Sequence, residues 1–290
     1  MRRRREASWG DGSEDPQCDG GKKSKKRHCW LRGRVVVTAG ALVLLLVAAG
    51  KHEHRLQMSH PPMVTFIIPS MLRRSTLNRT LQSLLNQTVP YWEAVVGVDA
   101  ITTKSNETIA LARNFIQDPS RVHYQNIHTA TKFRGRKRNG SGSVRNAMIK
   151  NHAIAEWIAF VDDDDTISPY YVEQLTQHIE AVKNDVDIVL FRMQGFPGPK
   201  DLVPPLNHTS HHLKVGDIGI SFAVRRKLFQ DGIEFVPHPS EDYSAYDRGA
   251  VVRISTCILY FIRQYPSSND IARPPHCILE PNDGNPITIK

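Results

Sequence analysis

The sequence predicts an α/β fold in which helices flank a mostly parallel sheet. Three observations predict it: an uncharged β-branched run opens the pattern at residues 64–69, strand-like and helix-like segments then alternate as far as residue 191, and acidic side chains follow two of the strands. Alternation of this kind builds parallel sheets, which bind ligands at the carboxyl ends of their strands. The residues directly after each strand are therefore the functional candidates.

Each element has its own signal. The run 64–69 has the near-continuous apolar character of a buried parallel strand. Ser75 is suited to the helix N-cap, and leucines at helical spacing follow it up to Asn86. Ser168-Pro169 begins another helix, with proline in its first turn. The full prediction is strands at 64–69, 93–98, 122–126, 157–161 and 187–191, and helices at 75–86, 107–115, 143–155 and 168–184.

The first 62 residues lie outside this pattern. The chain has 290 residues and a net charge of +9, of which +6 falls in residues 1–34, so the charge gives no support for a nucleic-acid partner. Residues 1–34 lack an apolar period and predict a disordered basic cytoplasmic tail. Residues 35–50 carry no charge and predict a transmembrane signal anchor, with a cleaved signal peptide or a buried core helix as alternatives. Residues 51–62 then form a stem, and 63–290 the folded domain.

The basic tail sets the expected orientation. Basic residues stay on the cytoplasmic side of a membrane, which predicts a single-pass type II membrane protein of the Golgi or endoplasmic reticulum with residues 51–290 in the lumen. Cys257 and Cys277 would meet an oxidising compartment there, either as a disulfide or as two buried thiols. Five N-x-S/T sequons, expected of a glycoprotein, begin at Asn78, Asn86, Asn106, Asn139 and Asn207.

The acidic run Asp162–Asp165 follows the predicted strand 157–161 directly. Side chains alternate along a strand, so Asp162 and Asp164 face one way and Asp163 the other. Adjacent carboxylates repel unless a cation or a donor neutralises them, and their hard oxygens favour Mg²⁺, Mn²⁺ or Ca²⁺. A solvated acidic loop is the alternative interpretation.

Three stretches, in this order, resemble the family 2 glycosyltransferases, which have the GT-A fold, a Rossmann-like fold of nucleotide-diphospho-sugar transferases. Residues 64–100 are similar to the family's first strand, first helix and second strand, 143–175 to its Arg-Asn helix and Asp-x-Asp block, and 219–248 to its acceptor segment with a Glu-Asp pair. The resemblance implies an inverting transferase that moves a hexose or N-acetylhexosamine from a nucleotide sugar, UDP-linked, to a hydroxyl of a glycan, glycoprotein or glycolipid.

The same resemblance implies the residues of the donor site. Those implied in nucleotide-sugar binding are Pro69, Ser70, Asp99, Arg145, Asn146, Asp162 and Asp163. Asp162 and Asp164 are the implied ligands of Mn²⁺ or Mg²⁺, whose charge would stabilise the departing nucleoside diphosphate. His276 is a further candidate ligand. The basic loop 132–138 is either a lid over the diphosphate or a solvated loop.

On the acceptor side, the resemblance implies that Asp242 is the general base that deprotonates the attacking hydroxyl, with Glu241 orienting the acceptor. Two departures from the family pattern are present. The loop that follows Asp99 lacks the family's second aspartate and Gly-Ser turn, and Asp231-Gly232 stands where the family often has two glycines.

Two other functions stay open at this point. Haloacid-dehalogenase-type phosphatases use Asp-x-Asp-x-Thr, which Asp162, Asp164 and Thr166 match. That motif belongs to a first strand, however, whereas about 95 residues of strand and helix pattern precede it in this chain. The second is a non-catalytic, membrane-anchored sugar-binding protein, which would bind a donor without turnover.

Overall fold

The computed structural model describes residues 61–70, 74–99, 121–127, 141–182, 185–195, 202–210, 213, 218–235, 250–263 and 277–280. All of them belong to one compact unit, Leu56–Lys290. Features predicted outside the described residues are the tail 1–34, the anchor 35–50, the helix 107–115, the loop 132–138, the pair Glu241-Asp242, and His276. Within the described ranges, no helix combines the length and the apolar character needed to cross a membrane.

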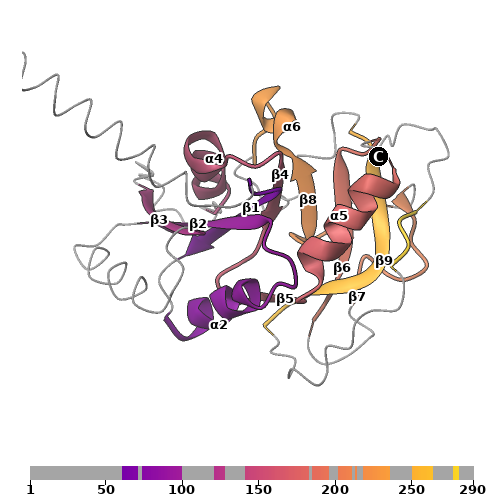
Figure 1. Ribbon diagram of the computed structural model, residues 1–290, viewed down its shortest axis with the longest axis horizontal. Helices are drawn as coiled ribbons and strands as arrows, with labels where there is room; N and C mark the ends of the chain where they lie inside the picture. Colours follow the sequence, from indigo (N-terminus) through magenta and orange to yellow (C-terminus); the bar gives the residue numbers. More distant parts are fainter. Residues whose placement is uncertain are drawn as a thin grey trace, which may run out of the picture. The chain divides into compact units, whose positions relative to one another are not determined.

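A nine-stranded sheet forms the centre of the described residues (Figure 1). Its strands are Val64–Ser70 (β1), Trp92–Asp99 (β2), Val122–Ile127 (β3), Trp157–Phe160 (β4), Thr166–Ile167 (β5), Ile188–Gln194 (β6), Leu202–Val203 (β7), Phe222–Arg225 (β8) and Val252–Phe261 (β9). They are ordered β3-β2-β1-β4-β8-β6-β9-β5, and β7 pairs with β6.

The sheet is mixed, with most strands in one direction. Parallel pairs join β3, β2, β1 and β4, and β6 pairs parallel with β9. Because β8 is antiparallel to both β4 and β6, those two strands share a direction. Only the short strands β5 and β7 join β8 in running the opposite way among the described strands. The mostly parallel α/β sheet is therefore confirmed, while β5, β7, β8 and β9 are additions to the predicted pattern.

The helices of the described residues are Arg74–Leu85 (α2), Ser141–His152 (α4), Tyr171–Ala181 (α5) and Arg226–Gln230 (α6). The first three confirm predicted helices to within a few residues. The third begins at Tyr171 and not at Ser168, because the Tyr171 N–H donates to the Ser168 carbonyl in a preceding turn.

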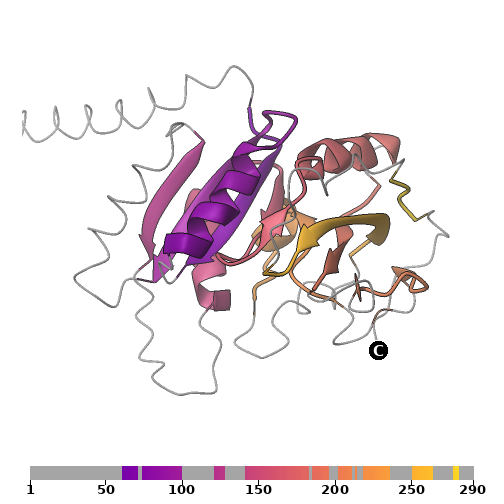
Figure 2. The same cartoon turned by 90° about the horizontal axis from the view of Figure 1, so that it is seen from below.

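Two helices cover opposite faces of β1 and β2, as both views show for α2 and α4 (Figures 1 and 2). On the α4 face the approach is close, because β2 carries Gly97. A Cβ atom at residue 97 would lie 2.3 Å from Sδ of Met148, which is far inside van der Waals contact. Glycine therefore permits the depth at which α4 packs on the sheet.

Aromatic side chains fill the core in two groups. Phe66 of β1 packs against Trp92 and Tyr171, with ring centroids 6.4 and 5.6 Å apart. Phe160 of β4 packs against Phe235, with centroids 5.0 Å apart and nearly perpendicular planes. Full burial of one such side chain contributes roughly 1.5–3 kcal/mol. The second group fixes Phe235 next to the end of β4, where the acidic run begins.

A disulfide joins Cys257 of β9 to Cys277, with Cα atoms 5.3 Å apart. Of the two alternatives drawn from the sequence, the disulfide is therefore confirmed. The joined segment also pairs with the strand, since Ser255 forms an antiparallel bridge with Leu279. The disulfide and the bridge together fasten residues 277–280 to β9.

Candidate functional site

The carboxyl ends of β1, β2 and β4 meet at one edge of the sheet, because β1 lies between the other two and all three are parallel. The register of β1 and β4 places Pro69-Ser70 level with the start of the acidic run. The Ser70 hydroxyl donates a hydrogen bond to Oδ2 of Asp163 at 2.8 Å. Asp99 ends β2 at the same edge, although its side chain lies outside the described residues. The structure thus brings the first-strand end and the acidic run together.

Asp162 and Asp164, called the outer pair below, have side chains that are 39% and 14% exposed. The Arg145 side chain is only 3% exposed, and its Nη2 donates to Oδ1 of Asp162 at 2.7 Å. The same guanidinium lies 5.5 Å over the Phe235 ring. At Asp164, Nε of Arg263 lies 3.4 Å from Oδ2, and this arginine is 76% exposed. Each outer carboxylate therefore faces an arginine, one buried and one exposed.

Asp163 and Asp165, called the inner pair below, are only 3% and 4% exposed. The Tyr260 hydroxyl donates to Oδ2 of Asp165 at 2.7 Å and accepts the backbone N–H of Asp162 at 3.1 Å. Burial, and next the charge of Asp162, raises the pKa of Asp165 to about 7. Hydrogen bonds hold the inner pair inside the protein. Strand alternation predicted that Asp163 faces away from Asp162 and Asp164, as the structure shows, while its implied role in nucleotide-sugar binding stays a prediction.

The acidic turn is supported from α2 and β9 as well as from β1. The N–H of Asp165 donates to the carbonyl of Asp162 at 3.1 Å and closes the turn. The buried Thr80 of α2 donates to the Asp165 carbonyl at 2.7 Å, and the N–H of Arg263 donates to Oδ1 of Asp165 at 3.0 Å. The turn is therefore fixed by contacts from elements that are far apart in the sequence.

Tyr260 and Arg263 were missed by the sequence analysis. The run Cys257–Ile262 is apolar and has the character of a buried strand, so it contained a signal for β9. That signal does not say which strand β9 pairs with. Only the pairing with β5, in which Tyr260 lies opposite Ile167, brings the end of β9 to the acidic turn.

Asn146 contacts the backbone of Phe235 with both ends of its amide. Its Nδ2 donates to the Phe235 carbonyl at 2.9 Å, and its Oδ1 accepts the Phe235 N–H, also at 2.9 Å. The structure thus shows Asn146 holding the segment that precedes Glu241 in the sequence by six residues. Its role at a nucleotide pocket stays a prediction.

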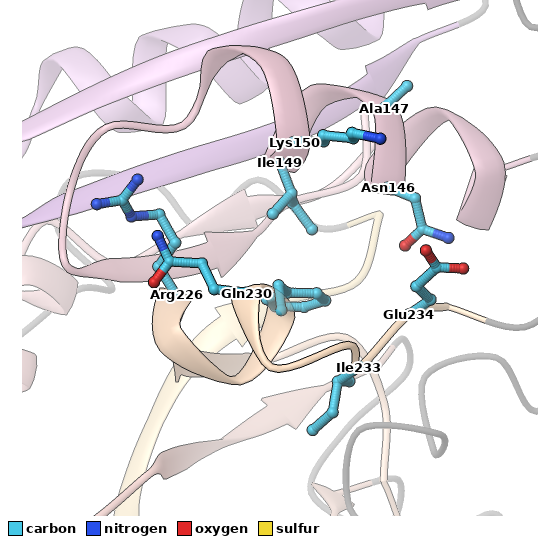
Figure 3. A pocket seen from close by; sticks show the side chains of 9 residues that line it. Asn146, Ala147, Ile149, Lys150, Arg226, Gln230, Ile233 and Glu234 are labelled. Atoms are coloured by element: carbon cyan, nitrogen blue, oxygen red, sulfur yellow. The ribbon is translucent and has the colours of Figure 1, made fainter.

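A surface cavity of about 430 Å³ lies between α4 and α6, with Asn146 in its lining (Figure 3). The view places Asn146 and Glu234 at one end, Arg226 and Gln230 at the other, and Ile149 between them. The two arginines differ in setting: Arg145 faces the acidic turn, whereas Arg226 faces this cavity. None of the acidic run Asp162–Asp165 lines this cavity, so the candidate site is assigned from the chemistry of the carboxylates and not from the cavity.

The outer pair fits a divalent cation that shares its ligands with a substrate. Within the described ranges, no group of three Asp, Glu, His or Cys side chains is close enough to hold a metal alone. Mg²⁺ commonly takes only one or two carboxylates and completes its shell with substrate phosphates and water. Asp162 and Asp164 are both accessible to solvent and supply that number.

Comparison with known families gives a match over residues 65–251, to the model described as glycosyl transferase family 2. Among curated proteins, the chain is 31% identical over 128 residues to the uncharacterized glycosyltransferase EpsJ of Bacillus subtilis (strain 168). That alignment covers 44% of this chain and 33% of EpsJ.

Comparison with solved structures gives matches to S. aureus TarS. Residues 1–349 of TarS match with a TM-score of 0.54 and 21% identity, over 69% of this chain and 60% of that one. The TarS complex with UDP-GlcNAc matches with a TM-score of 0.54 and 19% identity, over 73% of this chain and 61% of that one. The chain thus spans a third of EpsJ and about three fifths of the TarS fragment, and the likeness to TarS shows a shared GT-A fold.

Proposed function

The chain belongs to glycosyl transferase family 2, and from that premise we propose that it transfers a sugar from a nucleotide-sugar donor to a hydroxyl acceptor, with inversion and with a divalent cation. That it is a glycosyltransferase of the GT-A fold follows from the family match together with EpsJ and TarS. The single observation that carries the finer proposal is the outer pair, two accessible carboxylates at the edge of the sheet where parallel strands end.

The donor site is proposed at this edge. Ser70 lies at the end of β1, Asp99 at the end of β2, and Arg145 holds Asp162 in place. Asp162 and Asp164 would hold Mn²⁺ or Mg²⁺, which would offset the charge that develops on the departing nucleoside diphosphate. Arg145 keeps the Asp162 carboxylate in one orientation, because the arginine is itself buried and packed on Phe235. A preoriented ligand needs no rearrangement when the substrate binds.

The proposed donor is UDP-linked and carries a hexose or an N-acetylhexosamine. A TarS structure in complex with UDP-GlcNAc supports this choice, since it shows such a donor bound to the same fold. The proposed acceptor is a hydroxyl on a glycan, protein or lipid. Asp242 would deprotonate it, and Glu241 would orient it.

We further propose that residues 35–50 anchor the chain as a type II membrane protein of the Golgi or endoplasmic reticulum, between a cytoplasmic tail, 1–34, and a lumenal stem and enzyme. The Cys257–Cys277 disulfide supports an oxidising compartment. Asn207 supports it too, because this sequon asparagine is exposed in a turn. Protease added to sealed microsomes should leave residues 51–290 intact and remove a tag placed at residue 1.

The full chain in detergent, assayed with Mn²⁺ against a panel of nucleotide sugars and hydroxyl acceptors, tests the activity. Transfer that requires Mn²⁺ and is lost in Asp242→Asn, with donor binding retained, is the expected result. Hydrolysis of a generic aryl phosphate without any transfer would indicate the phosphatase alternative. Donor binding without turnover in the parent would indicate a sugar-binding protein.

A further inference from the structure

Arg263 has an unusual backbone for its residue type. Within the described ranges it is the one non-glycine residue with a positive φ, at 50°. The left-handed region is unfavourable for residues with a Cβ atom, by roughly 1–2 kcal/mol, and glycine or asparagine is usual there. Such a conformation persists only where surrounding contacts hold the backbone in place.

The backbone contact explains the conformation but not the arginine. The Arg263 N–H donates to Oδ1 of Asp165 at 3.0 Å, next to the Tyr260 hydroxyl on the other carboxylate oxygen. Any residue that can adopt a φ of about 50° would supply the same N–H. The side chain therefore needs a separate reason.

Stability does not supply that reason. The Arg263 side chain is 76% exposed, and its Nε lies 3.4 Å from Oδ2 of Asp164. Exposed ion pairs of this kind contribute about 0–1 kcal/mol, because water screens them. By contrast, Arg145 on the neighbouring carboxylate is 3% exposed and fixed at 2.7 Å. Arg263 is thus a second, exposed guanidinium at the outer pair.

We propose that Arg263 binds the diphosphate of the nucleotide-sugar donor, an inference that rests on the proposed function. A guanidinium presents its N–H groups in a planar fork that matches two phosphate oxygens. The Arg263 guanidinium lies beside Asp164. If Asp164 binds the cation, the diphosphate that shares this cation would lie next to the guanidinium. Its charge adds to the stabilisation of the departing nucleoside diphosphate.

Three variants at residue 263 separate this role from a structural one. Arg263→Gly and Arg263→Asn both accept a positive φ and keep the N–H to Asp165. Arg263→Lys keeps the charge without the fork. Arg79→Ala, which removes an exposed arginine from α2, is the matched control.

Calorimetry with Mn²⁺ and UDP, or GDP where the parent prefers it, gives the readout. Loss of a charged hydrogen bond predicts that Kd rises about 10- to 100-fold in Arg263→Gly and Arg263→Asn, and less in Arg263→Lys. Binding of the nucleoside without phosphates should stay the same in all variants, and the melting temperature should not fall in any of them, because glycine and asparagine tolerate the positive φ. The control should match the parent in every measurement.

The outcomes separate the role of Arg263 from the proposed glycosyltransferase activity on which it rests. A parent that binds UDP or GDP as weakly as the Arg263→Gly variant does, while still transferring sugar, would overturn the role of Arg263 alone. Unfolding of both Arg263→Gly and Arg263→Asn would also overturn it, since the side chain would then be structural. A parent that neither binds a nucleoside diphosphate nor transfers sugar would overturn the proposed function itself, and this inference with it.

Discussion

The inner and outer pairs of the acidic run have the same residue type in the same turn, yet they differ in exposure and in partners. Asp163 and Asp165 are buried and accept hydrogen bonds from Ser70 and Tyr260. Asp162 and Asp164 are accessible and face arginines. The difference teaches that the strand's alternation continues into the turn. The side chains on one side of the turn form hydrogen bonds inside the protein, and those on the other side form the proposed cation site.

The largest effect is expected from a substitution in the outer pair. Asp164→Asn should reduce sugar transfer by about 10³-fold or more, because the proposed cation loses a charged ligand while the donor still needs that cation. Melting temperature should change little, since Asp164 is partly exposed. Calorimetry of donor binding with and without Mn²⁺ measures the loss. Donor affinity equal to that of the parent would count against the metal assignment.

A buried group remote from the acidic run shows what burial alone does. His178 of α5 stacks on Phe191, and its Nε2 lies 2.8 Å from the Ser255 hydroxyl. Burial lowers its pKa from 6.5 to about 4. The unfolded chain therefore binds more protons between these values, and stability falls as pH decreases from 6.5 to 4. At about 1.4 kcal/mol per pH unit, the loss is on the order of 3 kcal/mol.

The measurement is urea unfolding of the parent and of His178→Gln across that pH range. The difference between the two chains isolates the histidine. This subtraction is needed because the pKa of Asp165 is raised. Its contribution favours the folded state at low pH, over a range that overlaps with that of His178 and with the opposite effect on stability. A difference that does not change with pH would contradict the prediction.

A smaller effect is expected where the two pairs are linked. Tyr260→Phe keeps the ring but removes the hydroxyl that donates to Asp165 and accepts the N–H of Asp162. Two buried partners then lose a hydrogen bond, which predicts a loss of about 2 kcal/mol in unfolding free energy. Urea unfolding at pH 7.5 measures it. A variant as stable as the parent would show that the hydroxyl does not join the pairs.

The smallest effect is expected from removing a hydrogen bond to the inner pair. Ser70→Ala removes the hydroxyl that donates to Asp163, and Ser221→Ala removes one that donates to the Phe191 carbonyl. Hydrogen bonds to charged groups contribute more than neutral ones, so about 1.5 kcal/mol is expected for Ser70 and about 1 kcal/mol for Ser221. Equal losses in the two variants, measured by thermal unfolding, would go against a special role for Asp163.

The part of the fold that repeats could be predicted from the sequence. Apart from the two-residue strand β5, the described strands and helices from Val64 to Phe191 each have a period that is visible locally, and alternation alone assigned the sides of Asp162 and Asp163. Strands β8 and β9 escaped prediction because their neighbours in the sheet are distant in sequence. Tyr260 and Arg263 escaped for the same reason, since their contacts with Asp165 span 95 and 98 residues.

Gly97 has a consequence for the site, although it is not part of it. Met148, which meets this glycine, lies one helical turn after Arg145 on the same helix. A methyl group at residue 97 would overlap the Met148 side chain, which would then have to shift within the turn that follows Arg145. The absence of a side chain in the middle of β2 therefore makes room for the helix that supplies Arg145, so a local packing detail of the sheet also bears on the candidate site.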